Sequence, residues 1–211
     1  MLDWVQDTRL RGWWRDYRDV FNGDLLPDYE TEAAHLRNYE TQIFPALLQV
    51  PGYSAAVLRG AGRTDPADIS RHVEARMCRR EILVRMKPAR LHAVVDESTF
   101  LRPIGGPTVM VEQLDYLLHM AQLPNIDLRV LPLAQDAHAG LVAPFTVLEF
   151  AHPLDTPIVC VPSLTQSLYL EQEDEVEAYQ AAFRSIQEAA ADPAASVALV
   201  ERHRERMREL L

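Results

Sequence analysis

The pattern between residues 91 and 131 constrains the fold more than any other part of the sequence. Residues 91–95 form a short apolar run typical of a buried strand, and residues 126–131 alternate like a second strand. Between them, residues 103–107 have the composition of a loop, and residues 108–122 carry apolar side chains at helical spacing. A strand, a helix and a strand in this order predict one βαβ unit with two parallel strands and a right-handed crossover.

Further elements are predicted on both sides of this unit. Asp65 and Pro66 have the types preferred at a helix N-terminus, and an apolar stripe then recurs at helical spacing from Ile69 to about Met86. After the unit, three short segments fit strands and predict an antiparallel continuation of the sheet. These segments are residues 145–150, 158–161 and 168–170.

The N-terminal part of the chain gives weaker signals. Residues 10–21 mix aromatic and charged side chains and predict a short helix that packs Trp13 or Trp14 inward. Residues 34–44 fit a helix face, but Pro45 and the β-branched end of the segment favour a strand. Both interpretations of this second segment stay open.

Together these elements predict a single domain of the mixed α/β (α+β) class over residues 1–211. Its mixed sheet would contain the βαβ unit and the antiparallel continuation, flanked by helices. Residues 1–27 would form an aromatic N-terminal helix segment and residues 172–211 two C-terminal helices. The sequence shows no internal repeat, low-complexity tract or linker that would divide it.

Composition disfavours several classes of function. The formal net charge of -10 opposes broad contact with nucleic-acid phosphates, although it leaves room for a local basic patch. Cys78 and Cys160 are distant in sequence and fit a reducing cytoplasm, with a single disulfide as the alternative. No apolar run reaches the roughly 20 residues of a membrane helix. We therefore expect a cytoplasmic protein without a membrane partner.

Known signatures of metal and cofactor sites are also missing from the sequence. The seven histidines are scattered without metal-binding spacing, and the glycines at 105–106 are not followed by the residues of a phosphate loop. No nucleophile elbow occurs. We expect no metal and no cofactor.

The apolar stretch 39–59 holds the first candidate binding residues. It is broken by two prolines and contains one amide, Gln49, inside an apolar run. An unpaired buried polar group costs about 1–3 kcal/mol, so this amide needs partners. Either Gln49 and Tyr53 line a ligand pocket, or Gln49 bonds to backbone in the core.

Polar residues also follow two of the predicted strands. Asp96 and Glu97 end the strand at 91–95, and ligands of open α/β sheets bind beyond such carboxyl ends. This pair could orient a cation or act as acid and base; alternatively, Asp96 caps the next turn and Glu97 pairs with Arg102. His138, in the loop after the following strand, could be a general base or a ligand donor, or could be solvent-exposed.

Three arginines are candidates for holding an anion. Arg76, Arg79 and Arg80 suit carboxylate or phosphate geometry. The alternative is a set of ion pairs with acidic neighbours: Glu74, Glu81 or Glu97. The full set of expected ligand-binding residues is Gln49, Tyr53, Arg76, Arg80, Glu97, Arg102 and His138.

The order of short motifs along the chain resembles a domain of unknown function from actinobacteria. That domain normally follows an XRE-type helix-turn-helix in regulators described as antitoxin-like. The resemblance covers nearly the whole chain and rests on the order and spacing of its motifs. They are Gly12-Trp13-Trp14, Glu30 to Ala34, Tyr39-Glu40, Pro45 to Gln49, Tyr53, Arg76, Arg79-Arg80, Asp96-Glu97, Leu101-Arg102, Gly105, Gln113-Leu114, Val130-Leu131-Pro132, His138, Gly140 and Phe145.

Three departures from this family pattern bear on function. No helix-turn-helix is present, because the chain begins at the tryptophan segment; either the natural protein lacks it or the expressed portion omits it. Val50 and Glu81 replace the usual threonine and glutamine of two motifs, and Ala46 replaces a glycine. Pro162 stands where a glutamate commonly ends a strand. If that glutamate serves a pocket in relatives, this protein binds something else or has changed role.

These observations give three hypotheses. The resemblance implies a sensing or interaction domain that binds a small molecule or a small partner protein, and that reaches DNA only through the missing helix-turn-helix. A stand-alone biosynthetic enzyme on the same scaffold would use acid/base residues in the cleft. A third possibility is a dimerisation module that forms a homodimer through the aromatic N-terminus and the last helix. The candidates for the enzyme are Asp96, Glu97, His138 and Tyr169.

Overall fold

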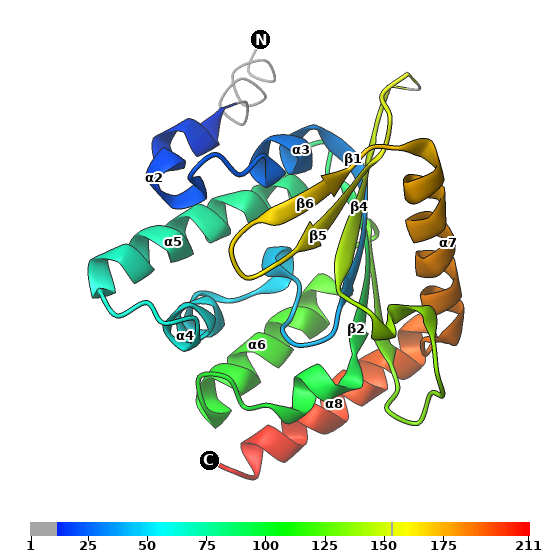
Figure 1. Ribbon diagram of the computed structural model, residues 1–211. Helices are drawn as coiled ribbons and strands as arrows, with labels where there is room; N and C mark the ends of the chain where they lie inside the picture. Colours follow the sequence, from blue (N-terminus) through cyan, green and yellow to red (C-terminus); the bar gives the residue numbers. More distant parts are fainter. Residues whose placement is uncertain (1–11, 153) are drawn as a thin grey trace.

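A six-stranded mixed sheet forms the centre of the protein, with strand order β3-β2-β1-β4-β5-β6. The computed structural model describes residues 12–152 and 154–211 (Figure 1). Strands β1, β2 and β3 are parallel, whereas β4, β5 and β6 continue the sheet in antiparallel pairs, which confirms the predicted mixed α/β class. The strands are β1 Ala33–Glu40, β2 Arg90–Asp96, β3 Ile126–Leu131, β4 Phe145–Phe150, β5 Ile158–Pro162 and β6 Ser167–Leu170.

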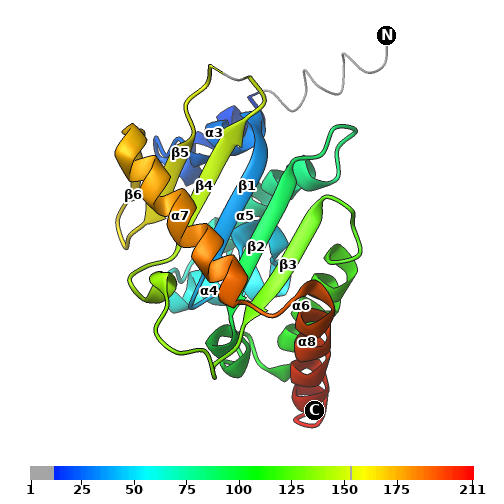
Figure 2. The same cartoon turned by 90° about the vertical axis from the view of Figure 1, so that its right-hand side faces the viewer.

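Two crossovers join the parallel strands, and their helices cover one face of the sheet (Figure 2). Helix α6 (Pro107–Met120) connects β2 to β3 and confirms the predicted βαβ unit. Helices α4 (Pro51–Gly60) and α5 (Pro66–Arg79) connect β1 to β2 and form a second parallel unit that we did not predict. The two predicted C-terminal helices are α7 (Glu173–Ala189), which crosses the opposite face, and α8 (Pro193–Arg208), which packs beside α6.

Helix α5 ends earlier than its apolar stripe predicts. It stops at Arg79 and is followed by a 3₁₀ turn, η3 (Arg80–Leu83), so Met86 is exposed instead of lying on a buried stripe. Pro88 disfavours helical geometry at the residue before it. The Asn125 side chain then donates to the carbonyl oxygens of Leu83 and Ala89, at 3.0 and 2.9 Å, and fixes the chain as it enters β2.

The segment at 34–44 is a strand for most of its length. It forms β1, which ends at Glu40 before Pro45, and it lies in the middle of the sheet between β2 and β4.

Upstream of β1 are three short helices: η1 (Trp13–Tyr17), α2 (Arg18–Phe21) and α3 (Leu26–Glu32). Trp13 is only half-buried; its ring packs edge-on against Trp14, Tyr17 and Phe21. The first eleven residues of the predicted N-terminal segment lie outside the described residues.

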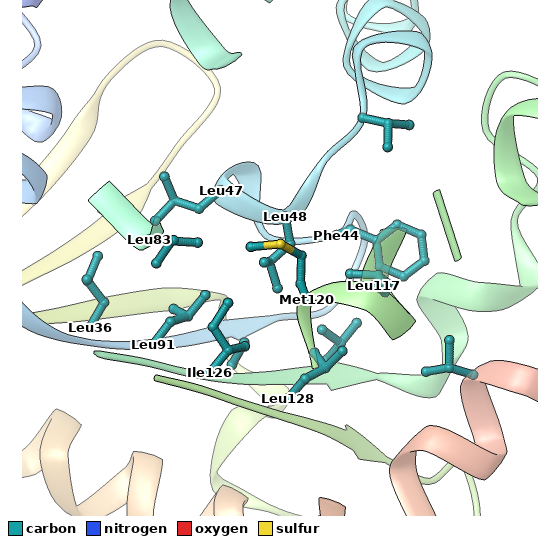
Figure 3. Close-up of a cluster of buried hydrophobic side chains, with 14 of the residues drawn as sticks. Leu36, Phe44, Leu47, Leu48, Leu83, Leu91, Leu117, Met120, Ile126 and Leu128 are labelled. Atoms are coloured by element: carbon teal, nitrogen blue, oxygen red, sulfur yellow. The ribbon is translucent and has the colours of Figure 1, made fainter. Parts of the chain in front are cut away.

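Each face of the sheet has its own hydrophobic core. The larger core packs β1, β2 and β3 against η2 (Ala46–Leu48), η3 and helix α6; Figure 3 shows part of it, with Leu36, Leu48 and Met120 among the labelled residues. The smaller core lies under α7 and includes Tyr39, Phe145 and Phe183. Because side chains alternate along a strand, neighbouring residues at the end of β1 point into different environments.

Candidate functional site

A cavity lies at the carboxyl edge of the parallel strands. The segments after β1 and β2 lead to the face covered by α4, α5 and α6, whereas the segment after β3 forms η5 (Ala139–Leu141), which packs against α7. The chain therefore diverges around the end of β1 and leaves a crevice of about 310 Å³. Crevices at this edge are the usual ligand sites of open α/β sheets. The crevice is lined by Tyr39, Thr41, Gln42, Asp96, Ser98, Gly140, Leu141, Val142, Ala143 and Pro144.

Asp96, which the sequence predicts at the end of the strand at 91–95, lines this crevice. It is the N-cap of the 3₁₀ turn η4 (Glu97–Leu101), and its Oδ1 atom accepts hydrogen bonds from the amide and the hydroxyl of Ser98. The predicted capping role is confirmed. Asp96 is also the one charged residue among those that line the crevice.

Tyr39 is one of the nine lining residues, all except Asp96, that were not site candidates from the sequence. Its side chain is 0% exposed, and among the described residues its hydroxyl has no hydrogen-bond partner. Burial, followed by the nearby Asp96 carboxylate, raises the pKa of this hydroxyl. Alternation along β1 places Tyr39 on the opposite face of the sheet from Leu36. This signal does not mark Tyr39 as a site residue, because an aromatic residue in a strand is ordinarily interpreted as part of the core.

His138 borders the crevice through Tyr39 and Gly140. Its ring packs edge-on against the Tyr39 ring with centroids 6.3 Å apart, and its Nδ1 atom accepts from the Gly140 amide at 3.2 Å. A Cβ atom added at Gly140 would lie 2.3 Å from the Tyr39 ring. The loop after β3 therefore sits directly on the end of β1, and only glycine leaves room for that contact.

Glu97 is turned away from the crevice. Its carboxylate accepts from the Leu133 amide and from Nε2 of His203 in α8, both at 2.9 Å, and lies 3.5 Å from Arg202. Burial would raise the pKa of Glu97, but the Leu133 amide and then His203 hold it below its ordinary value. The expected pairing with Arg102 is wrong; Arg102 is exposed, and its side chain has no hydrogen bond or ion pair with any described residue.

Gln49 lies on the α5 side of β1, in a network of its own. Its amide nitrogen donates to the Phe44 carbonyl at 2.7 Å, and its Oε1 atom accepts from Ser54 at 2.9 Å and from Arg76 at 2.8 Å. The Tyr53 hydroxyl accepts from the Phe44 amide at 3.4 Å. Gln49 thus makes the backbone bond that one of the two alternatives required, and neither Gln49 nor Tyr53 lines the crevice.

The three arginines of α5 and η3 do not form the expected ion pairs with Glu74, Glu81 or Glu97. Arg79 instead makes a buried bidentate pair with Glu30, at 2.7 and 2.8 Å. Arg80 donates to the Gln49 carbonyl at 3.2 Å and stacks over Tyr116. Burial, and after it the charge of Arg79, lower the pKa of Arg76 to about 10.

One known protein family matches this architecture. The family model described as "Domain of unknown function (DUF5753)" matches residues 24–202. The chain belongs to the DUF5753 family. The match takes in all six strands, both crossovers and every residue that lines the crevice. No curated protein and no solved structure matches the chain.

Tyr169, a candidate for the enzyme hypothesis, lies elsewhere in the DUF5753 domain. It is on the edge strand β6, where its hydroxyl donates to Asp24 and its ring packs 5.4 Å from that of Tyr29. Asp96 and His138 border the same crevice, whereas Glu97 and Tyr169 have separate partners. The structure does not bring the four candidates together.

Two further observations on the DUF5753 domain concern residues 12–152 and 154–211. Over these ranges no helix is long and apolar enough to cross a membrane. Within the same ranges, no three His, Cys, Asp or Glu side chains gather closely enough to hold a metal ion.

Glu40 follows Tyr39 in β1 and faces the α5 side of the sheet. It accepts one long hydrogen bond, 3.3 Å, from Asn38, and no cation of the described residues lies within 4 Å of it. Burial raises the pKa of Glu40 to about 7, although the Asn38 bond and the charges of Arg76 and Arg79 lower it. The carboxyl group therefore binds its proton more tightly in the folded chain than in the unfolded one.

Glu40→Gln is expected to stabilise the DUF5753 domain, and more so at high pH. A raised folded pKa means that stability falls as pH rises from the unfolded pKa to about 7, and Gln removes this loss. The gain in unfolding free energy should be about 2 kcal/mol larger at pH ~8.5 than at pH ~5.5. Urea denaturation at both pH values measures it. Glu32→Gln, on the exposed end of α3, is the control and should show no such pH dependence; an equal gain at both pH values would contradict the assignment.

Proposed function

We propose that this DUF5753 chain is a sensing domain that binds a small molecule in the crevice at the end of β1 and passes the bound state to helix α7. The observation that carries the proposal is Tyr39, which lines the crevice and whose buried hydroxyl has no hydrogen-bond partner among the described residues. An unsatisfied buried hydroxyl costs about 1–3 kcal/mol, and a ligand group that bonds to it recovers that cost.

A chain of aromatic contacts supports the route from the crevice to α7. The ring of Tyr39 lies 6.0 Å from that of Phe145, which in turn contacts Tyr179 at 4.9 Å and Phe183 at 6.4 Å. Tyr179 and Phe183 belong to α7, and η5 packs on the same helix. A ligand that shifts Tyr39 or η5 would therefore change the packing of α7, since closely packed side chains transmit small displacements.

The resemblance to antitoxin-like regulators extends this proposal. It implies that the chain corresponds to the effector part of an actinobacterial regulator of the kind that carries an XRE-type helix-turn-helix. The separation of Asp96, Glu97, His138 and Tyr169 favours sensing over the enzyme hypothesis, because acid/base catalysis needs its groups within hydrogen-bond reach of one substrate.

The proposal is tested by finding a ligand whose retention depends on the crevice. Purified protein is incubated with a small-molecule extract of the host cells, and retained compounds are identified by mass spectrometry after ultrafiltration. Ala143→Phe, which fills the crevice, should abolish retention of a compound that the unaltered chain keeps. Ala55→Phe, in the separate groove between α4 and α5, is the matched control and should keep it.

The coupling to α7 has its own measurement. Hydrogen exchange with and without the retained compound should slow in residues 138–144 and also in residues 173–189. Retention that Ala143→Phe leaves unchanged would refute the crevice as the site. Slower exchange confined to residues 138–144 would refute the transmission to α7.

A further inference from the structure

We propose that the crevice selects a compact ligand with a protonated amine at one end and an apolar body. This inference rests on the proposed function, because it names the class of ligand for the same crevice. Three features of the lining carry it: its charge, its hydrogen-bonding groups and its apolar wall.

The charge of the lining is negative. Asp96 supplies the one charge among the ten lining residues. Its Oδ1 atom is occupied by Ser98, whereas its Oδ2 atom has no hydrogen bond from any residue in the described part of the chain. Carboxylate or phosphate ligands would meet this charge without a compensating cation in the lining, so the crevice disfavours anions.

The polar groups next to Asp96 are able to accept hydrogen bonds. Tyr39, Thr41 and Gln42 line the same cavity, and each carries a side-chain oxygen; that of Tyr39 has no partner among the described residues. An ammonium group has three donors and no acceptor, which complements one carboxylate with neighbouring oxygens. Hydrogen bonds between charged groups are about twice as strong as neutral ones.

The rest of the lining is apolar and comes from the loop after β3. Leu141 and Val142 are 68% and 94% exposed, and Ala143 and Pro144 continue the wall. Exposed apolar side chains at the mouth of a cavity gain free energy when a ligand covers them. A volume of about 310 Å³ is at the lower end for small-molecule sites, so the ligand is compact.

The experiment compares three probes that share one ring and differ in charge: benzylamine, benzyl alcohol and benzoate. Each is titrated to about 10 mM, the weak end of measurable affinities. Binding is followed from the backbone amide signals of Thr41, Ser98 and Gly140 in two-dimensional NMR spectra. Benzylamine should shift these signals saturably and bind about tenfold more tightly than benzyl alcohol, while benzoate should not bind.

Asp96→Asn is the decisive variant, because asparagine keeps the N-cap of η4 and removes the charge. It should erase the advantage of benzylamine over benzyl alcohol. Asp136→Asn removes one charge from the exposed loop after β3, outside the lining, and should leave the advantage unchanged.

Each other outcome is informative. If benzyl alcohol or benzoate binds at these amides as well as benzylamine does, or Asp96→Asn leaves the preference intact, the amine selectivity is refuted while the crevice stands as a ligand site. If no probe shifts the three amides, the amine selectivity is refuted as well, and the retention experiment with Ala143→Phe decides the sensing role separately.

Discussion

Gly140→Ala is expected to lower the free energy of unfolding by about 3 kcal/mol, since overpacking a tight contact typically costs about 1–3 kcal/mol and occasionally more. The added methyl carbon would lie 2.3 to 2.6 Å from two ring carbons and the hydroxyl oxygen of Tyr39, closer than van der Waals contact allows. Tyr39 is fully buried between Phe145 and the loop after β3, so its ring has no room to retreat. The loop has to lift from the end of β1, which opens the crevice. Urea denaturation measures the loss.

Gly60→Ala is the matched control for this prediction. Gly60 is the last residue of α4, and nothing lies within 4 Å of a Cβ atom added there. Alanine favours helix over glycine by about 1 kcal/mol in a helix interior and by less at an end, so a small gain is expected. If Gly140→Ala were tolerated as well as Gly60→Ala, the close packing of the loop on Tyr39 would be wrong.

Glu97→Ala is expected to cost about 3 kcal/mol, because each buried donor left without an acceptor costs about 1–3 kcal/mol. The substitution would leave the Leu133 amide and Nε2 of His203 without their acceptor. The imidazole of His203 is stacked on Phe100, with centroids 5.2 Å apart, so it stays in place with an unpaired nitrogen. The loss of stability should appear in thermal and urea unfolding.

Two companion variants separate hydrogen bonding from charge at Glu97. Gln retains an acceptor for the Leu133 amide and should cost about 1 kcal/mol. Arg202→Ala removes a largely exposed partner and should cost less than about 0.5 kcal/mol. A loss for Arg202→Ala as large as for Glu97→Ala would show that the surface charge, and not the buried pair, holds α8.

The pH dependence of the same pair has a defined sign. The folded pKa of Glu97 is lowered, so its contribution to stability is present above the unfolded pKa and is lost as pH falls through the folded pKa. The difference in unfolding free energy between the unaltered chain and Glu97→Gln should therefore shrink on acidification.

Much of the fold could be predicted from residue patterns because those patterns are local. The βαβ unit has a continuous apolar strand at 91–95, an apolar helical stripe and an alternating second strand, and each signal agrees with its neighbours. The second crossover was missed because α4 lies in an apolar run whose periodicity does not separate a strand from a buried helix. The partners of β1 depend on contacts with distant strands.

The candidate site was predicted only in part, for a similar reason. Asp96 could be placed because it directly follows a strand, and its cap is formed with Ser98, two residues away. The partner of Glu97 is His203, 106 residues further along, and no local pattern connects them. Tyr39 was missed because a buried hydroxyl without a partner is a property of the packed molecule and not of the residue type.

The floor and the rim of the crevice differ in how much substitution they tolerate, and this difference affects how related proteins could diversify. Its floor, where Gly140 meets Tyr39, tolerates almost no change without loss of stability. Its rim is made by the outward side chains of Leu141 and Val142, which are largely exposed and therefore contribute little to folding. Selection for a new effector would therefore exchange rim residues freely while the floor persisted, so recognition and architecture would evolve at different rates in one short loop.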